Sequence, residues 1–188
     1  SSEFTVKAAS CGAGPYDLAH FNVEILKMTE YTMPVYLGYI ANAYTTYGLY
    51  TNPLTDMFNE PFAGRIPGLY DGKHDAGQIN GQLTPSISGL FTAEYLAGAN
   101  TDPKYTGIRS ALNANGVNGW DSEIPVLLLH GTADTQVMPL LSESMYNRMI
   151  GSGTSPLNCF YVTMPGLDHS QGAVPAGFAG YEFFKTYR

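Results

Sequence analysis

Two short runs of large apolar residues interrupt the mixture of polar and apolar positions along this chain. The first run, residues 126–129, holds four consecutive apolar side chains and is followed by His130 and Gly131. An unbroken apolar run of this length is typical of a parallel strand that is covered on both faces. The second run, residues 159–163, stops shortly before Pro165. The two runs predict two parallel strands, with room between them for one helix over about residues 139–151.

A third strand is expected near the N-terminus, at residues 4–10, because Gly12, Gly14 and Pro15 break the pattern after it. Parallel strands alternating with helices predict an α/β fold, with about three parallel strands and flanking helices. The helix between the later strands is expected to bury Met145, Met149 and Ile150. The last helix, at about residues 176–187, is expected to pack four aromatic side chains on the sheet: Phe178, Tyr181, Phe183 and Phe184.

The long segment between the first two strands has no convincing strand pattern. Four helices are expected in it, at residues 23–28, 35–47, 86–96 and 103–114, and residues 59–80 are expected to be an irregular, turn-rich loop. A connection of this length is too long for a plain loop. We therefore expect a helical insertion at residues 19–120, and a core formed by residues 1–18 and 121–188.

The second of these helices carries a stripe of tyrosines at helical spacing, with Pro34 suited to its first turn. The stripe consists of Tyr36, Tyr39, Ile40, Ala43, Tyr44 and Tyr47. The pattern favours rings that pack the core of the helical insertion itself. The alternative is that some rings line a pocket for an acyl or aromatic substrate.

Composition and charge narrow the classes of partner. The 188 residues carry a formal net charge of −7, which argues against nucleic acid or an anionic membrane surface, because both require basic patches. No apolar run is long enough to span a membrane. Cys11 and Cys159 are expected on the first and third strands, about 9–10 Å apart, so that both remain buried free thiols.

The candidate chemistry lies just after the two later strands. Asp134 follows the strand at residues 126–129, and His169 follows the strand at residues 159–163. In open parallel sheets the functional residues lie beyond the carboxyl ends of the strands. An acid and then a histidine in these places are the last two members of a catalytic triad. His130 is expected to be a hydrogen-bonded structural residue, and Asp168 to brace its loop or to lie in solvent.

The sequence around these residues resembles the α/β-hydrolase superfamily, in particular the C-terminal portion of secreted bacterial esterases and lipases. The resemblance is carried by H-G-T-A-D-T-Q-V-M-P at 130–139 and G-L-D-H-S-Q-G at 166–172, and more weakly by A-G-P-Y-D-L at 13–18 and N-G-V-N-G-W at 115–120. In that fold the triad runs nucleophile, acid, histidine. The resemblance implies that Asp134 is the acid, that His169 is the base and that residues 19–120 form a lid. It also implies a secreted or periplasmic protein.

The nucleophile elbow of that superfamily, G-x-S-x-G, does not occur in this sequence. We therefore expect the nucleophile on an N-terminal segment that also supplies the preceding strands. An open sheet edge at residues 4–10 would pair with that segment or with a second copy of the chain. Ser10, in A-A-S-C-G, is an alternative nucleophile, but Gly12, Gly14 and Pro15 favour a turn where the elbow requires a helix.

The expected activity is the hydrolysis of small-molecule carboxylic esters through an acyl-enzyme, with no cofactor and no metal. This chain alone is expected to be inactive. Two alternatives stay open: a serine peptidase of the same fold, because a triad does not separate ester from amide substrates, and a non-catalytic fragment or pseudoenzyme. Asp71, His74 and Asp75 cluster in the sequence, but their spacing fits no metal signature, and a loop with Asx turns is expected there.

Overall fold

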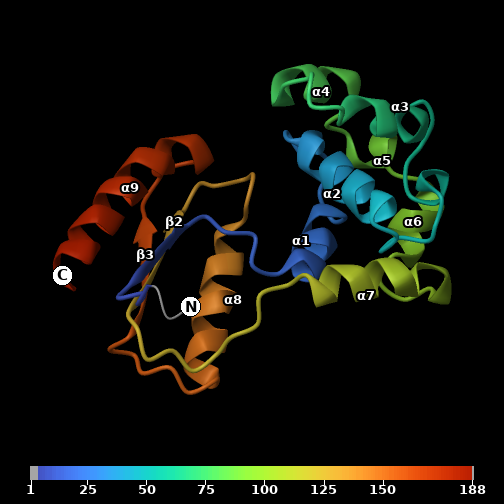
Figure 1. The fold of residues 1–188 in the computed structure, drawn as a ribbon. Coiled ribbons are helices and arrows are strands. Elements are labelled where there is room, and N and C mark those ends of the chain that lie inside the picture. The colour runs from blue at the N-terminus through green and yellow to red at the C-terminus, as the bar shows by residue number, and fades with distance from the viewer. Residues whose placement is uncertain (1–3, 188) are drawn as a thin grey trace. The chain divides into compact units, whose positions relative to one another are not determined.

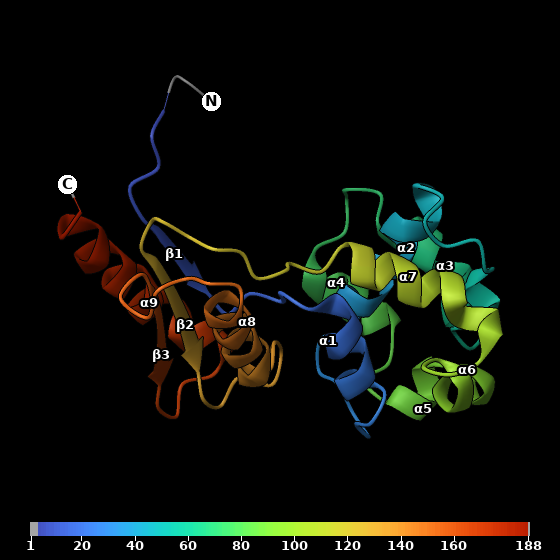
Figure 2. The same cartoon turned by 90° about the horizontal axis from the view of Figure 1, so that it is seen from below.

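The computed structural model describes residues 4–187, and the chain folds as two compact units. One unit combines residues 1–21 with residues 116–188, and the other consists of residues 22–115. The sequence predicted the two boundaries of the helical insertion between residues 18 and 19 and between residues 120 and 121. Figures 1 and 2 show the first unit as a small sheet with helices and the second as a helical array. Helix α1 (Leu18–Ile25) runs across the boundary between the units.

The sheet of the first unit has three parallel strands in the order β1-β2-β3. The strands are β1 (Ala9–Gly12), β2 (Val126–Gly131) and β3 (Cys159–Met164). The predicted α/β fold with three parallel strands and flanking helices is confirmed. The first strand begins later than the sequence predicted, because Ala9 is its first residue paired with β2 and the side chains of Phe4 and Val6 are exposed. The central strand β2 is buried along its whole length, as its apolar run predicts.

Two helices cover opposite faces of this sheet, α8 (Pro139–Gly151) and α9 (His169–Lys185). Side chains alternate between the faces of a strand. Val126 and Leu128 accordingly face α8, where they pack with Met145 and Met149. Full burial of each such side chain stabilises the fold by about 1.5–3 kcal/mol. The same alternation places His130 on the α8 face and Gly131 on the α9 face.

Helix α9 packs on β1 through small residues, which corrects the prediction of an aromatic inner face. Gly172 and Gly180 are buried, and a Cβ on Gly12 would lie 3.4 Å from the Ala176 Cβ. The small residues let the helix backbone approach the strand closely, so the bulky side chains turn outward. Phe178, Tyr181 and Phe184 are 69%, 53% and 42% exposed. Of the four predicted aromatics, Phe183 does contact a strand side chain, with its ring centroid 5.8 Å from that of Phe160.

The second unit contains short helices and no named strand among its residues, all of which the structure describes. Its elements after α1 are α2 (Pro34–Thr46), α3 (Phe62–Leu69), α4 (Ala76–Gln82), α5 (Ile87–Leu90), α6 (Ala93–Gly98) and α7 (Thr106–Ala114), with single 3-10 turns at Leu54–Asp56 and Pro103–Tyr105. Helices α3 and α4 lie in the segment predicted to be irregular. The helix predicted at 86–96 is divided into α5 and α6, because Thr92 starts a new helix by capping Tyr95.

Aromatic side chains from several elements form the core of this unit. The rings of Tyr95 and Tyr105 meet edge to face at 5.0 Å between centroids, and those of Phe58 and Phe91 are 4.9 Å apart. The predicted tyrosine stripe on α2 contributes little to this core. Tyr36, Tyr39 and Tyr47 are 37%, 59% and 82% exposed. The prediction that these three rings pack the core of the helical insertion is therefore wrong.

The two cysteines are free thiols, separated by the central strand as predicted. Cys159 on β3 is buried, whereas Cys11 on β1 is only half-buried. Among residues 4–187, no helix has both the length and the apolar character that crossing a membrane requires.

Candidate functional site

The candidate acid, Asp134, lies in a tight loop directly after β2. Its carboxylate is inaccessible to solvent. Its Oδ1 accepts two backbone hydrogen bonds, from the N–H groups of Gln136 and Val137, each at 2.9 Å. An aspartate that binds the backbone two and three residues ahead closes an Asx turn. Because the loop fixes Oδ1 in this way, Oδ2 is directed toward the neighbouring loop.

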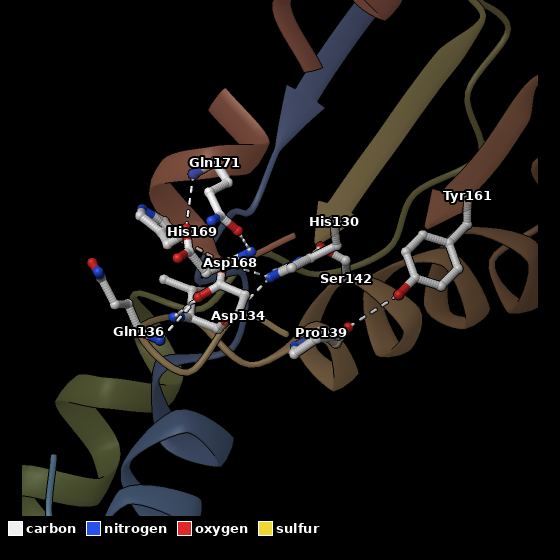
Figure 3. A network of polar contacts seen from close by, with 10 residues as sticks. His130, Asp134, Gln136, Pro139, Ser142, Tyr161, Asp168, His169 and Gln171 are labelled. Atoms are coloured by element: carbon white, nitrogen blue, oxygen red, sulfur yellow. Dashed lines mark hydrogen bonds and ion pairs between the residues drawn. The ribbon is translucent and has the colours of Figure 1, made fainter. Parts of the chain in front are cut away.

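The candidate base, His169, lies in that neighbouring loop region, as the first residue of α9. Its Nδ1 is 2.8 Å from Asp134 Oδ2, and Figure 3 shows the two side chains facing one another. The preceding residue, Asp168, caps the helix. Its side chain accepts the Gln171 N–H at 2.8 Å, and the Gln171 side chain accepts the Asp168 N–H at 3.2 Å. This reciprocal capping box fixes the backbone that carries the imidazole.

The contact with Asp134 determines which ring nitrogen of His169 carries hydrogen. A carboxylate oxygen only accepts hydrogen bonds, so Nδ1 is the protonated nitrogen and Nε2 keeps its lone pair in the neutral ring. Among the described residues Nε2 has no hydrogen-bond partner, and the side chain is 30% exposed. A neutral imidazole oriented by a buried carboxylate, with its second nitrogen accessible, can act as a general base.

The two residues border a cavity of about 350 Å³ that lies within the first unit. Small residues from β1 and α9 form much of its wall, among them Gly12, Ala13 and Ala176. Ala13 has a positive φ of 47°, in the left-handed region that a residue with a Cβ occupies at a cost of about 1 kcal/mol or more. Such strained residues cluster at functional sites, and this one lies in the wall of the candidate site.

The alternative nucleophile, Ser10, lines the same cavity as His169 but at another part of its wall. Ser10 lies within β1, where it pairs with Leu127, and its Oγ lies 2.8 Å from the position that a Cβ on Gly180 would take. Gly180 and His169 are about three turns apart on α9, on the order of 16 Å. In addition, β1 ends in a loop before α1 and does not open a helix directly. The structure therefore brings Asp134 and His169 together and leaves Ser10 apart from them.

His130 has a contact that the sequence interpretation did not include. It is fully buried, as a structural histidine should be, and its Nδ1 lies 2.6 Å from Ser142 Oγ. Its Nε2 lies 2.7 Å from the Val137 carbonyl oxygen and 3.2 Å from Asp134 Oδ2. The alternation of side chains along the strand could have indicated this contact. It places His130 on the same face as Val126 and Leu128, directly before the loop of Asp134.

The loop at residues 71–75, in the second unit, has a local structural role. Asp71 accepts the Lys73 N–H at 2.9 Å and lies 3.0 Å from His74 Nδ1. Asp75 caps α4 in a second capping box, with Gln78. Within residues 4–187, no group of three or more His, Cys, Asp or Glu side chains is arranged to hold a metal ion.

Comparison with known proteins gives structural matches only. No family model and no curated protein matches the sequence. Among solved structures, a hydrolase from Legionella pneumophila (lpg1103) superimposes with a TM-score of 0.82 at 22% identity, over 99% of this chain and 49% of that one. The rice cell wall degrading esterase LipA from Xanthomonas oryzae superimposes with a TM-score of 0.76 at 19% identity, over 99% of this chain and 52% of that one.

These matches show that the chain shares the α/β fold of the two proteins and no more, because identities this low carry information about the fold alone. The chain spans about half the length of each of these structural neighbours.

Proposed function

We propose that this chain is part of a serine hydrolase that cleaves carboxylic esters through an acyl-enzyme. Asp134 is the acid and His169 the base of its triad, and the nucleophile lies on an N-terminal segment outside this sequence. The observation that carries the proposal is the 2.8 Å contact between His169 Nδ1 and Asp134 Oδ2, beyond the ends of two neighbouring parallel strands and beside a cavity.

In the proposed mechanism, His169 Nε2 takes the proton of the nucleophile as it attacks the ester carbonyl. The imidazolium then returns that proton to the alkoxide that leaves. Asp134 holds the ring in the tautomer with hydrogen on Nδ1 and stabilises the transient positive charge. Water repeats the sequence with the acyl-enzyme and releases the acid. The buried carboxylate is suited to this role, because its two oxygens accept hydrogen bonds from fixed donors.

A companion segment is supported by two surfaces of the first unit. Within the described residues β1 pairs on one side only, with β2, and an open edge is a template for another strand. The outer face of α9 exposes Val174, Phe178 and Tyr181, and an exposed apolar patch of this kind is typical of a contact surface. We assign both surfaces to the N-terminal part of the same hydrolase. A second copy of the chain is the alternative occupant.

Two further parts of the proposal follow the sequence resemblance. The helical unit at residues 22–115 is proposed to act as a lid, with the exposed tyrosines of α2 available to an apolar substrate. The protein is proposed to be secreted or periplasmic. LipA, one structural neighbour, is an esterase, and an ester is the substrate class that we assign to the small-molecule ligand of this site.

The decisive experiment treats the polypeptide in which this sequence occurs naturally with a fluorophosphonate, which labels activated serines. The adduct is expected on a serine outside residues 1–188, and its formation is expected to slow strongly in the variant His169→Gln. An adduct on Ser10 would contradict the strand assignment given above. A native polypeptide that takes no label and turns over no chromogenic ester would refute the function and favour a non-catalytic protein, and faster turnover of peptides than of esters would favour a peptidase.

A further inference from the structure

A second imidazole, that of the fully buried His130, lies close to the same carboxylate oxygen as His169. Asp134 Oδ2 lies 2.8 Å from His169 Nδ1 and 3.2 Å from His130 Nε2, and the dashed contacts of Figure 3 connect all three side chains. With the two backbone N–H groups on Oδ1 and His169 on Oδ2, the carboxylate has three hydrogen-bond donors, and His130 Nε2 is a close neighbour of Oδ2. Both of its oxygens are therefore fixed, and water has no access to it.

The surroundings of His130 determine where its hydrogen lies. Its Nε2 faces two groups that only accept, the carbonyl oxygen of Val137 at 2.7 Å and Asp134 Oδ2, so Nε2 carries hydrogen. Its Nδ1 faces the hydroxyl of Ser142 at 2.6 Å, and a hydroxyl can donate to the lone pair of a neutral ring. One neutral tautomer satisfies all three contacts, and a fully buried ring is most stable in a neutral form that leaves no polar atom unpaired.

We infer that His130 is a positioning residue for the proposed acid: its Nε2–H binds the Val137 carbonyl and lies beside Asp134 Oδ2, and Ser142 on α8 keeps the hydrogen on that nitrogen. This inference rests on the proposed function of Asp134 and His169. Val137 closes the loop on both sides, because its N–H binds Asp134 Oδ1 while its carbonyl binds His130. Strand β2, the loop that carries Asp134 and helix α8 thus hold the carboxylate through one connected set of hydrogen bonds.

The arrangement also limits the charge that Asp134 presents to His169. The N–H dipole of His130 Nε2, 3.2 Å from Oδ2, partly offsets the negative charge that faces His169. Without His130, Asp134 would attract the His169 imidazolium more strongly, and Oδ2 would be less firmly directed. Two further titratable groups lie beside this cluster. Asp168 is held by its bond to the Gln171 N–H, and the phenol of Tyr16 near Ser142 has its pKa raised by burial, which keeps it neutral.

A purely structural role for His130 predicts something different. In that case, any substitution would lower stability and activity together, without changing the pH dependence of catalysis. His130→Phe keeps a ring of similar size but removes both ring nitrogens. His130→Gln keeps a donor near the position of Nε2. Ser142→Ala removes only the hydroxyl that faces Nδ1. The matched control is Thr154→Val, which removes a buried hydroxyl of the same unit that donates to the Trp120 carbonyl at 2.6 Å.

The experiment measures kcat/KM for a chromogenic ester against pH in the intact native polypeptide and these variants. His130→Phe is expected to lower kcat/KM by about tenfold to a hundredfold and to move the acidic limb of the profile to higher pH by about 0.5–1 unit. His130→Gln is expected to restore the limb and most of the activity. Thr154→Val is expected to leave the limb in place. An unmoved limb in His130→Phe, with activity that follows the folded fraction alone, would overturn the inference.

Nitrogen NMR of the imidazoles provides a measurement that does not depend on turnover. The wild-type protein is expected to show His130 as the neutral tautomer with hydrogen on Nε2, and Ser142→Ala is expected to shift the His130 Nδ1 resonance even if His130→Phe does not fold. Hydrogen on His130 Nδ1 in the wild-type protein would contradict the inference. If the wild-type polypeptide turns over no ester, the proposed function fails and this role fails with it, whereas turnover with an unmoved limb removes only the role of His130.

Discussion

Gly131, the last residue of β2, is the position at which one added methyl group should separate the proposed acid from the proposed base. A Cβ at Gly131 would overlap the carbonyl oxygen of Leu167 and would come within 3.0 Å of the Leu167 carbonyl carbon and 3.2 Å of the Asp168 oxygen. These are backbone atoms of the loop that leads into His169, so no flexible side chain can move aside. The Leu167 oxygen also accepts the Ala133 N–H at 3.1 Å, which ties this loop to the loop of Asp134.

The expected size of the effect follows from the displacement. To restore an ordinary contact, the Leu167 carbonyl must move by on the order of 1 Å, and misplacement of a catalytic group by that amount costs about a hundredfold in rate. The hydrogen bond between Asp134 and His169, now 2.8 Å, would approach or pass the limit of a real bond. Overpacking costs about 1–3 kcal/mol, and alanine in place of glycine returns about 0.5–1 kcal/mol. We expect a net destabilisation of about 1–2 kcal/mol.

The assay compares Gly131→Ala with Gly151→Ala in the native polypeptide, by ester turnover and by thermal unfolding. Gly151 ends α8 in the same unit, and a Cβ there would meet no atom within 4 Å. Gly131→Ala should lower kcat/KM by about a hundredfold and lower Tm by about 2–8 °C, whereas Gly151→Ala should leave both nearly unchanged. Turnover must be measured well below either Tm, so that unfolding does not contribute. Wild-type turnover in Gly131→Ala would refute the reasoning.

Three further predictions concern a helix cap and two titratable residues. Asp168→Ala removes the capping box of α9 and should cost about 1 kcal/mol in thermal unfolding, with a larger relative loss of ester turnover because His169 is the next residue. Burial raises the Tyr95 pKa from 10.0 to about 12, so the wild-type protein should lose stability between pH 10 and 12, where Tyr95 ionises in the unfolded chain but not in the folded one. Urea unfolding of Tyr95→Phe should show a smaller loss over that range, and equal losses would contradict the assignment. The Asn52 amide, and then Lys104, lower the Asp56 pKa below 3.8; the destabilisation in Asp56→Asn should therefore be present at neutral pH and should disappear as the pH falls below 3.8.

The sheet and the positions of the candidate residues could be predicted because their signals are local. Four apolar residues before His130 and Gly131 specify a strand buried on both faces, and β2 is buried throughout. In a parallel sheet, residues that follow neighbouring strands emerge at the same edge. For this reason the proximity of Asp134 and His169, whose Oδ2 and Nδ1 lie 2.8 Å apart, could be expected from two strand assignments.

Helices α3 and α4 were missed because their local sequence opposes helix formation. Residues 59–80 contain several glycines and prolines, and Pro67 lies inside α3. Tertiary contacts override this propensity, since Ala63, Ile66 and Leu69 bury one face of α3. For α4 a readable signal existed, because Asp75 and Gln78 have the spacing of a capping box.

The prediction for the orientation of α9 is wrong because the size of its side chains does not by itself determine which face is buried. The strand beside the helix, A-S-C-G, offers small side chains, and a helix that presents Gly172, Ala176 and Gly180 can approach it closely. Dispersion contacts weaken steeply with distance, so a close fit of small groups competes with the burial of larger ones. The aromatic residues then remain on the outer face.

The earlier start of α9 changes how the proposed base is held. The sequence placed His169 in a loop, but Asp168 and Gln171 form a capping box, and His169 is the first residue of a 17-residue helix. The imidazole therefore starts from the first turn of a capped helix and lies 2.8 Å from the Asp134 carboxylate. The helix supplies a rigid backbone, and the buried carboxylate supplies the orientation and charge, so neither element alone would suffice.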